Sequence, residues 1–178
     1  DNLLIYYAGH GELDKLEGQG YWIPTDGDKK MRANWISTTF ILNQIKATEA
    51  KHVLVIADSC FSGSINRGNQ KMSTSKDLSK LARKKTRVSI TSGGNEPVMD
   101  SGNEGHSIFA YSLIKILNEK NKFFYSTDLF SEIRKYVLNN ANQTPEWSIL
   151  AKTDHDMAAI SYFFLLISLY SYPRYFVF

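Results

Sequence analysis

The sequence has very little cysteine: its 178 residues include only one, Cys60. A single cysteine excludes an internal disulfide framework and zinc sites built on paired cysteines, so we expect a reducing, cytoplasmic setting. A lone cysteine is either a small buried hydrophobe or a reactive thiol. Its neighbours in the sequence must therefore decide between these two roles.

We expect neither a membrane span nor a leader in this sequence. Residues 157–178 are very apolar, but several serines, Pro173 and Arg174 interrupt them before the roughly 20 apolar residues that a span requires. The N-terminus enters an apolar run at residues 3–8 without a charged segment before it, so we expect no signal peptide and a cut inside a domain. No membrane partner is expected. A phosphate-binding loop is missing too, which counts against a flavodoxin-like binding domain of another kind.

Positive charge is in slight excess, and the excess is local. The net charge is +3, and a basic stretch without aromatic residues runs from Lys71 to Arg87. A nucleic-acid-binding patch would interleave aromatics, so this pattern predicts a solvated loop and no nucleic-acid partner. Residues 62–86, which are rich in Ser, Lys, Gly and Asn, are predicted to be a linker between two strands.

Short apolar runs alternate with stripes at helical spacing. Residues 3–8 and 52–57 read as strands buried on both faces, and residues 87–91 and 160–166 as two further strands. Helices are predicted after Ser37 or Thr38, from about Ser107, and near Ser126. This order indicates an α/β domain with a mainly parallel sheet, where active-site groups gather at the carboxyl ends of strands.

Two chemically active residues follow predicted strands. His10 lies in residues 7–11 (YAGHG), where flanking glycines let the backbone turn tightly and leave the imidazole accessible. Cys60 lies in residues 57–63 (ADSCFSG), 50 residues further on. A catalytic histidine about 50 residues upstream of the cysteine is the spacing found in caspases. Together the two motifs indicate a nucleophile and its base.

Four further segments carry the same resemblance: residues 23–26 (IPTD), 91–98 (TSGGNEPV), 105–110 (GHSIFA) and 143–145 (QTP). From Leu3 to about Leu150 the chain resembles the caspase-like cysteine peptidases, on the metacaspase, orthocaspase and paracaspase side. The resemblance implies a three-layer α/β/α domain over residues 1–166 whose first strands are missing, followed by an apolar tail of unclear role at 167–178. It also implies protein or peptide substrates, and fused sensor or repeat domains in the full-length protein.

The resemblance assigns roles to these residues. His10 acts as base and acid, and Cys60 attacks the scissile carbonyl as a thiolate. The backbone N–H groups of Gly11 and Cys60 form the oxyanion hole. This chemistry requires no metal or other cofactor. Retention of both His10 and Cys60 favours an endopeptidase over the alternative, a catalytically silent scaffold or recruitment domain.

The identity of residue 58, an aspartate, predicts which side chain the enzyme accepts before the scissile bond. Residues two apart in an extended segment face the same side, so its carboxylate emerges near the Cys60 thiol. Animal caspases, which accept an acidic residue before the scissile bond, hold Gln there, whereas a carboxylate attracts Arg or Lys at P1. The alternative is that Asp58 caps a turn or braces the site. Glu96 and Asp100, in a loop that lines the specificity pocket in this family, are either a second acidic wall or solvated carboxylates.

Calcium is the one ion that the resemblance raises. Some metacaspases are activated by calcium, and Asp26 and Asp28 are either part of such a site or simple turn formers. His106 is interpreted as a residue at a helix start and not as a catalytic one.

Overall fold

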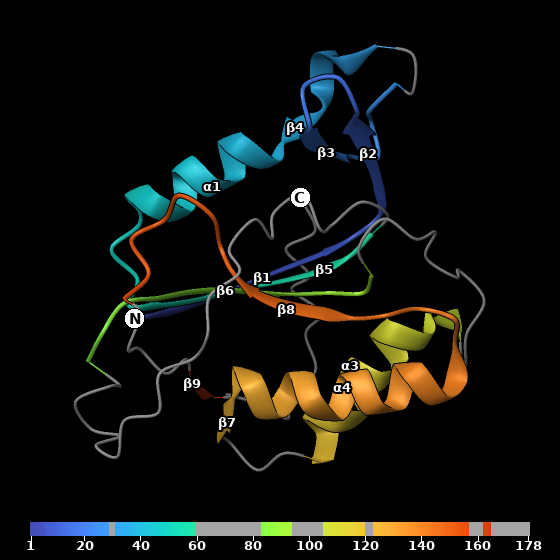
Figure 1. Cartoon of the computed structure of the whole chain (residues 1–178), viewed down its shortest axis with the longest axis vertical. Coiled ribbons are helices and arrows are strands. Elements are labelled where there is room, and N and C mark those ends of the chain that lie inside the picture. The colour runs from blue at the N-terminus through green and yellow to red at the C-terminus, as the bar shows by residue number, and fades with distance from the viewer. Residues whose placement is uncertain (29–30, 60–82, 94–104, 120–122, 157–161, 165–178) are drawn as a thin grey trace.

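A four-stranded sheet forms the centre of the computed structural model, which describes residues 1–28, 31–59, 83–93, 105–119, 123–156 and 162–164 (Figure 1). The strand order is β1-β5-β6-β8, and β1, β5 and β6 run parallel while β8 is antiparallel to β6. These strands are β1 (Asn2–Ala8), β5 (His52–Asp58), β6 (Thr86–Thr91) and β8 (Glu146–Ile149). The mainly parallel sheet confirms the predicted α/β class.

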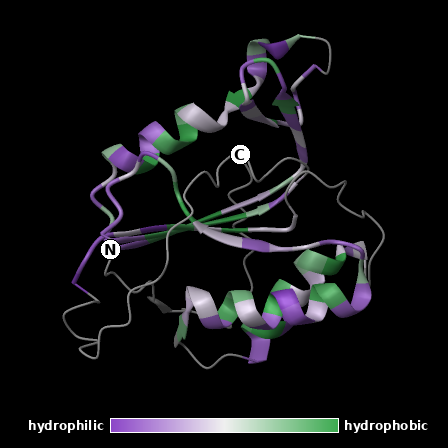
Figure 2. Cartoon of the chain, in the orientation of Figure 1, coloured by the Kyte–Doolittle hydropathy of each residue, from purple (hydrophilic) through white to green (hydrophobic). Residues whose placement is uncertain are grey.

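Helices cover both faces of this sheet. Helix α1 (Thr38–Ala47) lies over one face, and α3 (Ile108–Glu119) and α4 (Ser126–Asn140) lie over the other (Figure 1). Strand β5 supplies both cores because its side chains alternate: Val53 and Val55 pack with α1, whereas Leu54 and Ile56 pack with α3 and α4. Hydrophobic residues accordingly run through the central strands in Figure 2. The predicted three-layer arrangement is confirmed.

The helices begin where the sequence predicts them. The Ser37 hydroxyl accepts a hydrogen bond from the Phe40 N–H at 3.1 Å and so caps α1. Helix α3 follows directly on Ser107, and α4 starts at Ser126. None of the helices in the described ranges has the length and apolarity needed to cross a membrane.

Most of the smaller strands are new relative to the sequence predictions. Strands β2 (His10–Asp14), β3 (Gln19–Ile23) and β4 (Ile36–Ser37) form an antiparallel sheet, and a short 3₁₀ helix, η1 (Arg32–Asn34), precedes β4. Strand β7 (Phe123–Tyr125) pairs antiparallel with β9 (Tyr162–Phe164), which falls inside the strand predicted at 160–166. His10 is therefore the first residue of a strand, where the glycine-flanked motif had predicted a turn.

Strand β1 does not match the prediction that it is buried on both faces. Leu4 and Tyr6 are 42% and 40% exposed, whereas every residue of β5 is buried. In the part of the chain that the structure describes, β1 is an edge strand of the main sheet, with α1 over its other face. An unbroken apolar run in the sequence does not distinguish an edge strand from a central one.

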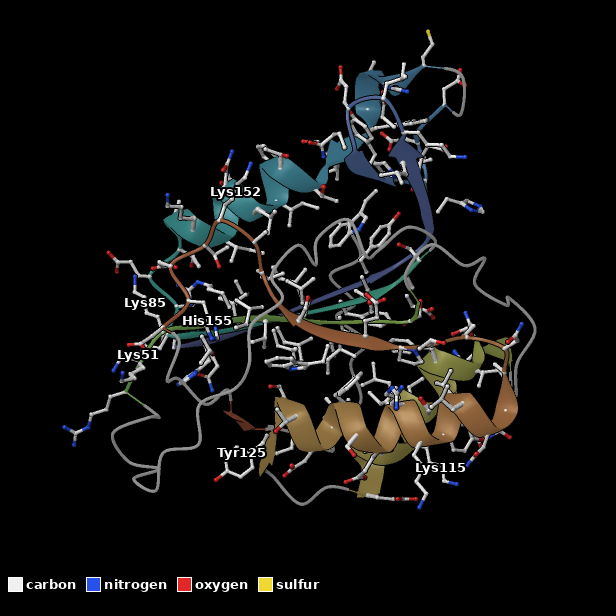
Figure 3. All side chains as sticks on the ribbon, viewed as in Figure 1. Lys51, Lys85, Lys115, Tyr125, Lys152 and His155 are labelled. Atoms are coloured by element: carbon white, nitrogen blue, oxygen red, sulfur yellow. The ribbon has the colours of Figure 1, made fainter. Side chains whose placement is uncertain are left out.

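Arg87 is an exception to the prediction that the basic stretch is a solvated loop, and residues 71–82 of that stretch lie outside the described residues. Its side chain is fully buried at the amino end of β6, where Nη1 donates hydrogen bonds to the carbonyl oxygens of Lys51 and Thr86, at 3.0 and 2.8 Å. The Arg87 Nε lies 3.1 Å from the Asp154 Oδ1. Lys85, which also pairs with Asp154, lies near Lys51 and His155 at this end of the sheet (Figure 3). The buried arginine is stabilised because backbone carbonyls accept hydrogen bonds from its Nη1 and the Asp154 carboxylate compensates its charge.

His155 makes the fold sensitive to acid. Its Nδ1 accepts a hydrogen bond from the Arg87 backbone N–H at 2.9 Å, so Nδ1 carries no proton in the folded protein. Burial lowers the pKa of His155, and the positive charge of Arg87 acts in the same direction, against the Asp154 and Asp156 carboxylates. The unfolded chain therefore takes up this proton at a higher pH than the folded protein. The resulting stability is present above about pH 6.5 and is lost as the pH falls from there towards the lower folded pKa.

We expect the melting temperature to fall between about pH 7 and 5, and to fall less in His155→Gln, whose amide does not titrate. Thermal unfolding followed by circular dichroism at several pH values measures this. The matched control is His106→Gln, because His106 is exposed. Equal pH dependence in wild type and His155→Gln would contradict the prediction.

Candidate active site

The carboxyl ends of the three parallel strands meet at one edge of the sheet. Ala8, the last residue of β1, is paired with Asp58, the last residue of β5. The Gly9 N–H donates to the Asp58 carbonyl oxygen at 3.3 Å, and the Ser92 N–H donates to the Ala57 carbonyl oxygen at 3.0 Å. The chain therefore leaves β1, β5 and β6 side by side, which is where parallel α/β sheets place their active sites.

His10 and Cys60 each continue from one of these adjacent strand ends. His10 stands two residues after the end of β1, and Cys60 two residues after the end of β5. The register pairs the two strand ends directly, Ala8 with Asp58. Cys60 itself lies outside the described residues. The pairing of the two side chains stays a prediction.

Tyr7 anchors the backbone at His10. Its hydroxyl donates to the His10 carbonyl oxygen at 2.6 Å and accepts from the Ile23 N–H at 3.1 Å. Its ring stacks on Trp22, with the centroids 4.2 Å apart and the planes 4° from parallel. Burial raises the pKa of Tyr7 to about 12, so the hydroxyl remains a donor at neutral pH.

Gly9 is required by this anchor and not by a left-handed turn. A Cβ at Gly9 would lie 2.9 Å from the Tyr7 hydroxyl oxygen, closer than a Cβ atom approaches a non-bonded heavy atom. Its φ angle is not positive, in contrast to those of Gly18 and Gly105. The glycine therefore makes room for the aromatic ring that holds the His10 backbone.

Asp58 is buried at the candidate site and is held by a serine. Its side chain is 7% exposed, and one carboxylate oxygen, Oδ2, accepts a hydrogen bond from the Ser107 hydroxyl. Ser107 comes directly before α3. Tyr6 of the neighbouring strand β1 is affected by this carboxylate. Burial is the larger cause and the negative charge of Asp58 the second, and together they raise the pKa of the Tyr6 phenol to about 12. Asp58 thus lies between β1 and α3.

The other predicted site residues have mixed outcomes. Gly11 lies in β2 opposite Trp22, so its N–H belongs to the strand that starts at His10. Glu96 and Asp100 lie outside the described residues. The oxyanion hole and the second acidic wall stay predictions.

Asp26 and Asp28 take part in a turn through their main chains. The Asp28 carbonyl oxygen accepts from the Trp35 indole N–H at 2.9 Å and from the Met31 N–H at 3.2 Å. Among the described residues, no group of three or more His, Cys, Asp or Glu side chains is placed to hold a metal ion. Calcium activation stays a prediction. His106 is exposed and stands just before the start of α3, as interpreted from the sequence.

Sequence reasoning missed two contacts of this site. Tyr7 and Ser107 both lie inside motifs that carried the family resemblance, but neither received a role beyond a strand and a helix start. Each acts on a residue that is distant along the chain, Tyr7 on Ile23 and Ser107 on Asp58. Local pattern identified the motifs, and only the fold shows which of their members touch.

Comparison with known families agrees with this geometry. The family model described as the caspase domain matches residues 1–155, a range that includes all of the candidate site residues. No curated protein matches the sequence. The family is one of cysteine peptidases, and the parallel sheet between two helical layers fits it. The chain therefore belongs to the caspase domain family of peptidases.

Proposed function

We propose that the chain is a cysteine endopeptidase that cleaves peptide bonds after Arg or Lys, with His10 and Cys60 as its catalytic dyad. Membership of the caspase domain family supports the reaction class. One observation carries the proposed site: the buried Asp58 carboxylate ends β5, two residues before the only cysteine and level with the end of β1. We place the enzyme with the metacaspase-like members, in a reducing cytoplasm that keeps the thiol active.

In the proposed reaction His10 takes the Cys60 thiol proton, and the thiolate sulfur forms a bond to the scissile carbonyl carbon. The oxyanion of the tetrahedral intermediate accepts hydrogen bonds from the Gly11 and Cys60 N–H groups. The intermediate collapses to a thioester, and the His10 imidazolium gives its proton to the departing amine. Water, deprotonated by His10, then attacks the thioester; the acid product leaves and the thiol is regenerated.

Asp58 provides the specificity of the proposed enzyme. A carboxylate in a desolvated position gains from a charge-assisted hydrogen bond with Arg or Lys, and it repels an acidic P1 side chain. Glu96 and Asp100 are proposed as a second acidic wall in the loop after β6. If activity depends on calcium, Asp26 and Asp28 are the proposed ligands of that ion.

Tyr7→Phe tests the anchor at His10. The substitution keeps the ring that stacks on Trp22 but removes the hydroxyl that binds His10 and Ile23. We expect kcat to fall about tenfold with KM nearly unchanged, and the free energy of unfolding to fall by about 1 kcal/mol. Steady-state kinetics and urea unfolding measure the two effects. Tyr111→Phe is the control, and wild-type kcat in Tyr7→Phe would contradict a positioning role.

A fluorogenic peptide panel with Arg, Lys, Asp and Ala at P1 tests the proposal. We expect kcat/KM for Arg and Lys to exceed that for Asp by about a hundredfold or more, the size of a lost charge pair in a desolvated site. Assays with calcium and with a chelator measure whether the activity depends on that ion. A preference for Asp would refute the specificity, and no cleavage together with an unreactive Cys60 would favour the silent scaffold.

A further inference from the structure

Ser107 connects the start of α3 to the carboxylate of Asp58 through one hydroxyl group. The Ser107 Oγ accepts a hydrogen bond from the Ala110 N–H at 2.9 Å and donates its only proton to the Asp58 Oδ2. The Ser107 carbonyl oxygen accepts from the Tyr111 N–H at 2.9 Å, the first bond of the helix. Ser107 is therefore the N-cap of α3 and also the donor to a carboxylate of another element.

This double use of the hydroxyl orients the Asp58 carboxylate. A serine hydroxyl has one proton and two lone pairs, so donation to Asp58 and acceptance from Ala110 occur together and strengthen one another. The contact also brings the negative charge to the positive end of the helix dipole. The start of α3 therefore orients the Asp58 carboxylate and also stabilises its negative charge.

The helix that carries Ser107 is firmly packed. Phe109 is fully buried, and Leu113 and Ile116 are 6% exposed, all in the core cluster that contains Leu54 and Ile56 of β5. Ser107 therefore cannot shift without disturbing the same strand that ends in Asp58. The geometry of the pair is determined by two elements of one core.

We propose that Ser107 is a positioning residue for P1 recognition: it holds the Asp58 carboxylate in the orientation that receives the basic P1 side chain of a peptide. This inference rests on the proposed function, in which Asp58 contacts the substrate. A guanidinium binds both oxygens of a carboxylate in one plane, whereas an ammonium binds as a point charge. Loss of the Ser107 hydroxyl should therefore weaken Arg recognition more than Lys recognition.

The expected signature is a change in KM and in the ratio of P1-Arg to P1-Lys cleavage. In Ser107→Ala we expect KM to rise about tenfold for a P1-Arg peptide and about threefold for P1-Lys, with kcat within about twofold of wild type. The labelling rate of Cys60 by iodoacetamide should also remain unchanged. Ser107→Thr keeps a hydroxyl and should restore KM and the ratio to within about twofold.

Two further variants separate this role from a structural one. Ser107→Gly removes the hydroxyl but is nearly as good at an N-cap, so it should fold and show the same kinetic change as Ser107→Ala. Ser112→Ala is the matched control, because Ser112 is buried in the same helix and its hydroxyl donates to the Phe109 carbonyl oxygen at 2.8 Å. We expect this control to keep the wild-type Arg to Lys ratio.

The outcomes distinguish the inference from the function on which it rests. Suppose that the wild type cleaves P1-Arg peptides and that Ser107→Gly keeps the wild-type KM and the wild-type ratio of P1-Arg to P1-Lys cleavage. This result would overturn the positioning role and leave the proposed function intact. An equal change of the ratio in Ser112→Ala would also overturn it, because the effect would then come from a loosened helix. A wild-type protein that cleaves no peptide of the panel would contradict the proposed function, and the positioning role with it.

Discussion

Replacing Cys60 by alanine is expected to abolish peptide hydrolysis, lowering kcat/KM by about four orders of magnitude or more. Cys60 is the only cysteine of the chain, and alanine supplies no nucleophile to form the thioester. Turnover of a fluorogenic P1-Arg peptide measures the loss. Intact-mass analysis after iodoacetamide treatment should show one adduct on wild type and none on the variant.

Replacing His10 by alanine is the second test of the catalytic dyad. His10→Ala should lower turnover by about a thousandfold and slow thiol labelling at neutral pH, because the imidazole no longer favours the thiolate. The matched control is His106→Ala, which removes another exposed histidine and should behave as wild type. Unchanged turnover in Cys60→Ala would refute the enzyme assignment, whereas loss in both histidine variants would point to a folding defect.

The second large effect is expected for Asp58→Asn. The amide keeps the shape of the side chain but removes the charge that would pair with a basic P1 residue. We expect kcat/KM for a P1-Arg peptide to fall about a hundredfold, a few kcal/mol, which is the usual loss for a charge-assisted pair in a desolvated site. Hydrolysis of a P1-Asp peptide should stay negligible in both proteins.

Controls separate substrate recognition from bracing of the site. Asp128→Asn removes an exposed carboxylate in the first turn of α4 and should leave the P1 preference unchanged. Cys60 labelling should proceed in Asp58→Asn at nearly the wild-type rate. If Asp58→Asn retains wild-type activity toward P1-Arg but loses thermal stability, then Asp58 braces the fold, and the basic P1 preference needs another source.

Several features of this protein were determined by sequence alone because they depend on local pattern. The apolar run of residues 52–57 predicts a buried strand, and the serines before α1 and α3 predict helix starts, since both signals lie within a few residues. The 50-residue spacing of His10 and Cys60 and the motifs around them indicated the family that the comparison then showed. The alternation of strands and helices predicts that both residues follow the carboxyl ends of strands, and the structure describes this position for His10.

Only the tertiary structure decided which of these elements touch. Arg87 reads as one more charge of a basic stretch, but carbonyls from another strand end and the Asp154 carboxylate bury it. Residues 3–8 are predicted to be a strand buried on both faces, but Leu4 and Tyr6 of β1 lie outside the core that α3 and α4 form with β5, and one face of β1 is exposed. The contact of Ser107 with Asp58 joins residues 49 apart in the chain. The periodicity of hydrophobic residues shows which face of a strand or helix is apolar. The burial of Arg87, the exposure of β1 and the contact of Ser107 with Asp58 depend instead on which elements pack together.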